Sequence, residues 1–205
     1  MDSVFIAGSR ALTHLDAQVK DRLDNILRKE FTVLVGDANG ADKAVQRYFA
    51  QRAYKRVVVY CMETCRNNVG NWPVRSHSGE PGQKRDRHYY GIKDQAMAKD
   101  ASWGFMLWDG ISKGTLANVV NLLDYGKKVL LFSAPKKEFF TLRTIEDLDQ
   151  MLRANGVEDV AGVLAALENR ESITRVHAQA TIQKLRGKVQ WDGNLEQSRQ
   201  SRFPD

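Results

Sequence analysis

Residues 31–49 read FTVLVGDANGADKAVQRYF, and this stretch decides the fold. Its first five residues are apolar or β-branched and stop at Gly36, which is typical of a buried strand. From Ala41 onward, apolar side chains recur at steps of three and four residues, which predicts one face of a helix. A turn rich in Gly, Asp and Asn separates the two. The stretch is therefore a strand, a turn and a helix, the building unit of an α/β protein.

The same order of strand and helix recurs on both sides of this unit. Further apolar runs predict strands at residues 4–7, 56–60, 103–108 and 128–132. Helical spacing predicts helices over about 12–27, 88–99 and 115–125. Five continuous apolar strands joined by helices imply a parallel sheet that is covered on both faces. We therefore predict an α/β domain over residues 3–135: a Rossmann-like, doubly wound, parallel five-stranded sheet.

After residue 135 the pattern becomes helical. A capping signal at Thr144 predicts a helix that ends at residue 155, and further helices fit residues 158–168 and 172–185. The last twenty residues contain few apolar side chains. We expect residues 136–185 to form a C-terminal helical extension and residues 186–205 to form an extended tail.

The 205 residues carry a formal net charge of +6 at pH 7, and the excess lies in the first two thirds of the chain. Residues 1–135 hold 20 Lys and Arg against 14 Asp and Glu. Much of this excess falls within residues 66–93, and the Gly, Pro and polar residues of 66–87 predict a long loop. A basic loop favours an anionic partner, although a solvated surface loop also explains it.

Apolar residues make up 42% of the chain and charged residues 27%, which excludes wholesale disorder. No stretch approaches the roughly 20 apolar residues that a membrane-spanning helix needs, and no basic segment precedes the first short apolar run. The two cysteines, Cys61 and Cys65, indicate buried or inert thiols and neither a disulfide framework nor a four-ligand zinc site. We expect a cytoplasmic protein with no metal, no cofactor and no membrane partner.

Three glycine turns follow predicted strands and lead straight into predicted helices: 8–10, 36–42 and 109–115. In an open parallel sheet, ligands bind outside the carboxyl ends of the strands. A helix N-terminus there offers unpaired N–H groups, and glycine lets an anion approach the backbone, so the turns predict a phosphate site. The candidate ligand-binding residues are Gly8, Ser9, Arg10, Gly36, Asp37, Gly40, Asp109, Gly110, Ser112, Lys113, Gly114, Thr115 and Asn118, with Arg85 from the basic loop.

In combination, the segments GSR at 8–10, GDANGAD at 36–42, DQAMA at 94–98 and WDGISKGT at 108–115 resemble the SLOG superfamily. That superfamily joins the Smf/DprA proteins with the Lonely-Guy (LOG) phosphoribohydrolases, and the resemblance, over about residues 3–135, is to its small bacterial branch with GSR and GxxGAD motifs. It implies a Rossmann-like fold that binds nucleotides or nucleotide-derived ligands. A homodimer, as in many LOG-like proteins, is a further expectation.

LOG enzymes cleave the N-glycosidic bond of nucleoside monophosphates with the motif P-G-G-x-G-T-x-x-E. Here Gly114 and Thr115 match the G-T pair, whereas Asn118 stands where the family has its Glu. An Asn side chain can neither accept a proton nor carry a full negative charge, so this departure favours binding over hydrolysis. Asp37 and Asp109 remain as catalytic candidates, and ordering of their own turns explains each of them equally well.

The function that we expect is the binding or sensing of a nucleotide-derived phosphate ligand at the carboxyl edge of the sheet. The alternatives are a hydrolase or transferase acting on a nucleotide N-glycosidic bond and, less favoured, single-stranded DNA binding, since no aromatic platform is interleaved with the basic residues.

Residues 182–202 resemble the tail of VapB-type antitoxins, which packs onto a toxin. This resemblance implies a toxin–antitoxin-type partner protein, but docking of residues 186–205 on a second copy of the chain or on the tail's own domain is favoured over it.

Overall fold

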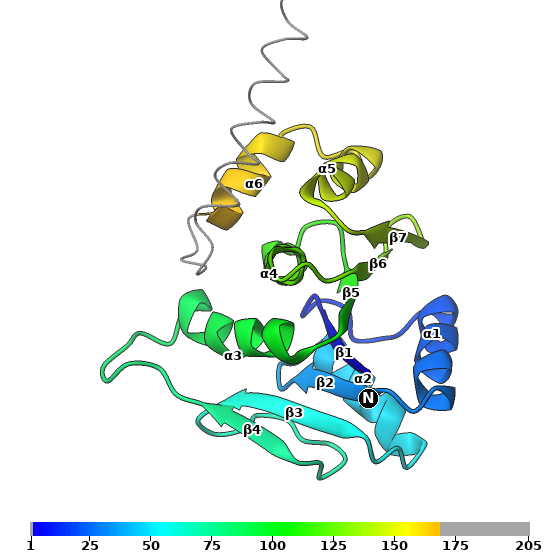
Figure 1. Ribbon diagram of the computed structural model, residues 1–205, viewed down its shortest axis with the longest axis vertical. Helices are drawn as coiled ribbons and strands as arrows, with labels where there is room; N and C mark the ends of the chain where they lie inside the picture. The colour runs from blue at the N-terminus through cyan, green and yellow to red at the C-terminus, as the bar shows by residue number, and fades with distance from the viewer. Residues whose placement is uncertain (1, 169–205) are drawn as a thin grey trace, which may run out of the picture. The chain divides into compact units, whose positions relative to one another are not determined.

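A computed structural model of the chain describes residues 2–168, and its residues 2–157 form a sheet with helices on both faces (Figure 1). In chain order the elements are β1 (Ser3–Gly8), α1 (Ala17–Arg28), β2 (Thr32–Gly36), α2 (Ala41–Gln51), β3 (Val57–Met62), β4 (Val74–His77), α3 (Arg87–Asp100), β5 (Trp103–Trp108), α4 (Lys113–Asp124), β6 (Val129–Ser133), β7 (Glu138–Leu142), α5 (Ile145–Ala154) and α6 (Val160–Glu168).

The strand order is β4-β3-β2-β1-β5-β6-β7, and every neighbouring pair is parallel except β6 and β7. The predicted doubly wound α/β fold is confirmed. The predicted number of five strands is wrong, because β4 and β7 add one strand at each end. β4 lies inside the predicted loop 66–87, and its mostly exposed residues give no apolar signal. β7 is an antiparallel edge strand with only Leu142 fully buried.

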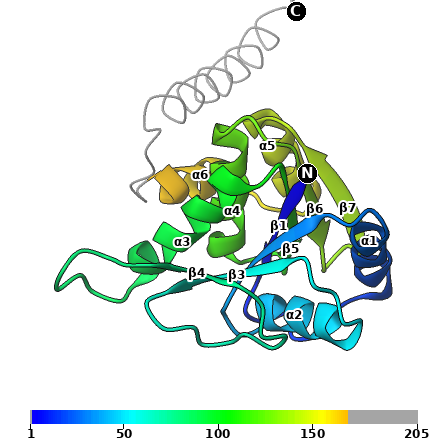
Figure 2. The same ribbon diagram turned by 60° about the horizontal axis from the view of Figure 1, so that its bottom comes forward.

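Helices cover the two faces of the sheet in two groups. Figure 2 shows α1 and α2 on one side of the sheet, with α3 and α4 on the other. The chain reverses direction between β1 and β5: the connection after β1 leads to the first face and the connection after β5 leads to the second. This reversal creates a switch point at the carboxyl ends of β1 and β5, the place where open α/β sheets bind ligands.

A hydrophobic core cluster lies between the sheet and the first pair of helices. β-Branched and aromatic side chains of alternate strand positions, such as Val4, Ile6 and Val35, pack against Leu23 of α1 and Phe49 of α2, all of them buried. Continuous apolar strands of this kind are required because both faces of a parallel sheet are covered. The core therefore fixes the strand ends from which the turns emerge.

The chain divides into two compact units, one up to Val157 and one from Glu158 onward. The first unit contains β7 and α5, so the sheet extends beyond residue 135. The predicted capping signal of α5 is present: the Thr144 hydroxyl accepts a bond from Asp147 N at 3.2 Å, and the Asp147 carboxylate accepts one from Thr144 N at 3.1 Å.

Among the described residues, the second unit contains α6, whose bounds nearly coincide with those of the helix predicted over residues 158–168. The helix expected over 172–185 and the tail 186–205 lie outside the described residues. No helix within residues 2–168 combines the length and the apolar character that crossing a membrane requires.

Candidate functional site

The three glycine turns meet at one edge of the sheet. β2, β1 and β5 are consecutive parallel neighbours, so the turns 36–42, 8–10 and 109–115 leave the same edge side by side. We call the carboxyl ends of these strands, with the turns that follow them, the carboxyl edge. The sequence prediction that the turns lie together is confirmed by this strand order.

The first and second turns are in close backbone contact. Gly40 has φ +84° and ψ −129°, and a Cβ placed on it would lie 2.5 Å from the carbonyl carbon of Arg10. The N–H of Ala41 donates to the carbonyl of Ser9 at 3.1 Å. A Cβ on Gly8 would lie 2.8 Å from that of Ala41. Glycine is therefore required at positions 8 and 40 for the two turns to pack.

A hydrogen bond across the switch point joins the first turn to the third. The Ser9 hydroxyl, 4% exposed, donates to the carboxylate of Asp109. The other oxygen of Asp109 accepts from Ile111 N at 3.2 Å and Ser112 N at 2.8 Å. Burial raises the pKa of Asp109, but these hydrogen bonds outweigh it and leave the pKa below its ordinary value. Asp109 is thus an ionised acceptor that orders the switch point.

Asp37 forms an ion pair that the sequence did not indicate. Its carboxylate is 1% exposed and accepts three hydrogen bonds from Arg66: from the main-chain N at 3.1 Å, from Nε at 3.0 Å and from the terminal guanidinium nitrogen at 2.6 Å. Burial raises the pKa of Asp37, whereas the Arg66 hydrogen bonds and the charge of Lys93 lower it further than burial raises it. Asp37 is therefore ionised and held in place.

A second buried ion cluster lies behind the second turn. Lys93 of α3 reaches the turn, since a Cβ on Gly36 would lie 2.9 Å from its Nζ. Lys93 Nζ pairs with Asp94 at 2.7 Å, and Asp42 accepts a bond from Ala38 N at 3.2 Å. Burial raises the pKa of Asp42 to about 6, with Lys93 opposing and Asp94 reinforcing the rise. Asp42 is thus a buried carboxyl whose pKa lies near neutrality.

The start of α4 provides the third part of the edge. Ser112 is the N-cap, and its hydroxyl accepts from Thr115 N at 3.3 Å and from the Thr115 hydroxyl at 3.0 Å. Lys113 and Gly114 are exposed, so the first turn of this helix is open to solvent. Asn118 lies on the same helix and is buried.

Buried polar side chains other than aromatic ones are concentrated at this edge. They come from strand ends, from the turns and from the helix segments that follow. Gln46 reaches the edge from α2, where its side chain donates to the Gly36 carbonyl at 2.8 Å, and Lys93 reaches it from α3. Burying polar groups lowers stability unless each finds a partner, so such a concentration needs a reason. Within residues 2–168 the set is Ser9, Asp37, Asp42, Gln46, Lys93, Thr115, Asn118 and Ser133.

A cavity of about 260 Å³ lies beside the switch point. Its walls come from the connection between β1 and α1, from α1 itself and from the ends of β5 and β6. The lining is mostly apolar, with the polar groups of His14 and Asp16 among it; Asp16 also caps α1 by accepting from Gln18 N at 3.0 Å. Its volume is below the roughly 300–1,000 Å³ of sites that enclose whole small molecules.

Of the predicted basic residues, Arg10 and Lys113 lie exposed on the carboxyl edge. Arg85 does not join them, since its guanidinium pairs with Glu63 at 2.6 Å. Arg66 and Lys93 were missed as parts of the site, because the carboxylates that they meet come from a segment far away in sequence.

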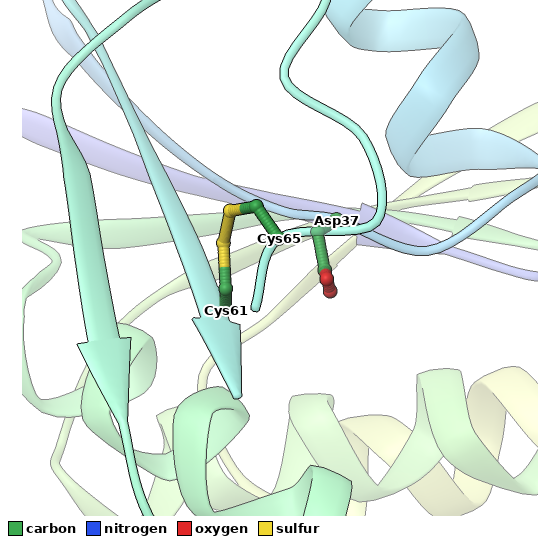
Figure 3. Close-up of side chains that lie close together, drawn as sticks. All are labelled: Asp37, Cys61 and Cys65. Carbon is green, nitrogen blue, oxygen red and sulfur yellow. A yellow bond between two sulfur atoms is a disulfide. The ribbon is translucent and has the colours of Figure 1, made fainter. Parts of the chain in front are cut away.

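Cys61 and Cys65 are joined by a disulfide, so the prediction of free thiols is wrong. Figure 3 shows this bond next to Asp37. The two sulfurs and a carboxylate oxygen of Asp37 lie within 4.8 Å of one another, the spacing of a small metal site. Both oxygens of Asp37 already accept bonds from Arg66, and that positive charge opposes a cation here.

The fold and the edge together define a Rossmann-like α/β protein with buried polar groups gathered at the carboxyl ends of its strands. No protein-family model matches the chain, and no curated protein matches it either.

Proposed function

We propose that the carboxyl edge binds a small, phosphate-bearing ligand derived from a nucleotide. The observation that carries this proposal is that the buried, non-aromatic polar side chains of residues 2–168 gather at and beside the carboxyl ends of the strands. Elements that only build a fold place apolar side chains at such positions, because unpaired or strained polar groups cost stability. The resemblance of the three turns to the SLOG superfamily agrees with the same ligand class.

We assign the phosphate, the sugar and the ring of this ligand to three different places. Its phosphate meets the exposed first turn of α4, where main-chain N–H groups and Lys113 favour an anion, with Arg10 on the facing turn. A sugar hydroxyl donates to Asp109, which is partly exposed and has an acceptor position left beyond its three hydrogen bonds. An apolar ring enters the cavity beside α1.

Binding is favoured over bond cleavage by the state of the carboxyl groups. The pKa values of Asp37 and Asp109 are both below the ordinary value, so neither group can act as a general acid near neutral pH, and Arg66 occupies both oxygens through which Asp37 would act as a base. Asp42 has a pKa of about 6 but is buried beneath the second turn. Asn118 supplies no charge.

A small ligand is also favoured over a nucleic acid, because the basic segment is largely neutralised by acidic partners. Three arginines and one lysine of residues 66–93 form ion pairs, three of them at 2.6 Å and one at 2.7 Å. A cationic side chain that is already paired with a carboxylate neutralises phosphates less well, so fewer counterions are released from the nucleic acid and the gain in affinity is small. The pairs are Arg66–Asp37, Arg75–Asp100, Arg85–Glu63 and Lys93–Asp94.

Thermal unfolding of the full chain with inorganic phosphate, ribose 5-phosphate, AMP, GMP and ADP-ribose tests the proposal. A ligand at 100 times its Kd adds about 2.7 kcal/mol to the free energy of unfolding. We expect Arg10→Ala and Lys113→Ala to weaken binding, and Arg28→Ala, at the far end of α1, to leave it unchanged. A panel without any shift, or shifts that Arg10→Ala and Lys113→Ala leave intact, overturns the proposal.

A further inference from the structure

The cysteine pair is placed where it fastens the second turn. Cys61 lies in β3 and is fully buried, whereas Cys65 lies in the connection after β3 and is partly exposed. Their Cα atoms are 5.1 Å apart, and four positions separate them in sequence. A bond that closes so short a loop constrains the unfolded chain little, so its main effect is on the local position of Cys65 in the folded protein.

The residue after Cys65 is Arg66, which makes all three hydrogen bonds to the Asp37 carboxylate. One of them comes from the main-chain N–H of Arg66, so its length depends directly on where Cys65 is held. The chain beyond is attached to the same turn, because the Asn67 side chain donates to the Asp37 carbonyl at 2.8 Å. The disulfide therefore fixes one end of a segment whose other contacts belong to the carboxyl edge (Figure 3).

Metal binding and thiol–disulfide exchange are two alternative functions of these sulfurs, and the charges of the neighbouring side chains distinguish between them. Reduced Cys61 and Cys65 with Asp37 offer three ligands for a thiophilic cation such as Zn²⁺. Such a cation would share both Asp37 oxygens with the Arg66 guanidinium, and the Lys93 charge acts on the same carboxylate. Two positive charges beside the site oppose a divalent cation. Exchange between thiols and the disulfide brings no further positive charge to Arg66 and Lys93.

We propose that Cys61 and Cys65 form a thiol–disulfide exchange site that fastens and releases Arg66 at the Asp37 turn. The partner is a dithiol reductant. One of its thiolates attacks the sulfur of Cys65, the partly exposed residue, and Cys61 leaves as a thiolate, which forms a mixed disulfide on Cys65. The second thiol of the reductant displaces Cys65. The two cysteines gain two electrons and two protons in all, and the reductant becomes a disulfide.

The exchange changes the carboxyl edge through one hydrogen bond. In the oxidised protein, β3 holds Cys65 and the Arg66 N–H stays on Asp37. In the reduced protein, the link to β3 is lost and the segment around Arg66 is free to separate from the turn. This proposal does not depend on the proposed ligand, because its readouts are the thiols and the Arg66 N–H alone.

The test uses the full chain equilibrated in mixtures of reduced and oxidised dithiothreitol. Mass spectrometry after alkylation counts the thiols, and hydrogen exchange by NMR follows the Arg66 N–H, with Val35 N–H in β2 as a control. We expect no alkylation in the oxidised protein, two alkylated thiols in the reduced protein, and exchange of the Arg66 N–H at least about tenfold faster on reduction. The Cys61→Ser, Cys65→Ser double variant is expected to show the fast exchange in every mixture.

Three outcomes overturn the proposal. The first is that both cysteines remain alkylatable in fully oxidised dithiothreitol. The second is a disulfide whose reduction leaves the Arg66 exchange rate unchanged, which makes the bond a local crosslink only. The third is that the reduced protein takes up one equivalent of Zn²⁺ and Asp37→Asn abolishes the uptake, which assigns the cluster to a metal.

Discussion

Replacing Gly40 by Ala tests whether the carboxyl edge depends on direct packing between two turns. Gly40 has φ +84°, a conformation that L residues rarely adopt, and strain of this kind costs about 1–3 kcal/mol. The added Cβ would also lie 2.5 Å from the Arg10 carbonyl carbon, and contacts closer than 3.0 Å do not occur. The turns must therefore separate by at least about 0.5 Å. This movement weakens the 3.1 Å hydrogen bond from Ala41 N to Ser9, a loss of about 1 kcal/mol.

Gly40→Ala is thus expected to lower the free energy of unfolding by about 2–4 kcal/mol, measured by urea titration. Gly82→Ala is the matched control, because Gly82 also has a positive φ, +78°, but has no atom within 4 Å of an added Cβ. The control is expected to lose about 1 kcal/mol from backbone strain alone. If the two variants unfold within about 0.5 kcal/mol of each other, the contact between the turns does not stabilise the edge and the reasoning fails.

Two further predictions concern the polar groups. The folded pKa of Asp42, about 6, exceeds the ordinary 3.8, so its contribution to stability is full below pH 3.8 and is lost as the pH rises through 6. The loss is about 3 kcal/mol, and Asp42→Asn should flatten this slope in urea titrations between pH 4 and 7. Ser9→Ala removes a hydrogen bond to the ionised Asp109 and should lower the unfolding free energy at pH 7 by about 2 kcal/mol. A loss below about 0.5 kcal/mol would show that the bond is not formed in solution.

Much of the fold was predictable because a covered parallel sheet leaves a clear signal. β1, β2, β3, β5 and β6 are continuous apolar runs, since each has neighbours on both faces and both edges. β4 and β7 have a neighbouring strand on one edge only, and their exposed positions carry polar residues such as Arg75 and Glu138. An edge strand of four or five residues gives too short a pattern to separate it from a loop.

The candidate site was predictable only where it follows from strand order. The three turns carry local signals, and parallel pairing places them together. The partners of Asp37 and Asp42 carry no such signal, because Arg66 and Lys93 lie 29 and 51 positions away from those carboxylates respectively and meet them only in the folded chain. The sequence also showed no sign of the Cys61–Cys65 bond, because two cysteines at this spacing are equally compatible with thiols.

The glycines of the three turns are needed for different structural reasons, and these reasons are relevant to the proposed ligand. Packing against a neighbouring backbone requires Gly8 and Gly40, and a φ of +92° requires Gly110. Gly114 has neither reason: a Cβ there would meet only Ser112 Oγ, at 3.8 Å, among the described residues. Glycine also lowers helix stability by roughly 0.5–1 kcal/mol relative to alanine. Since the fold gains nothing from Gly114, the open space at the first turn of α4 fits the close approach of an anion to the main chain, as the proposed function requires.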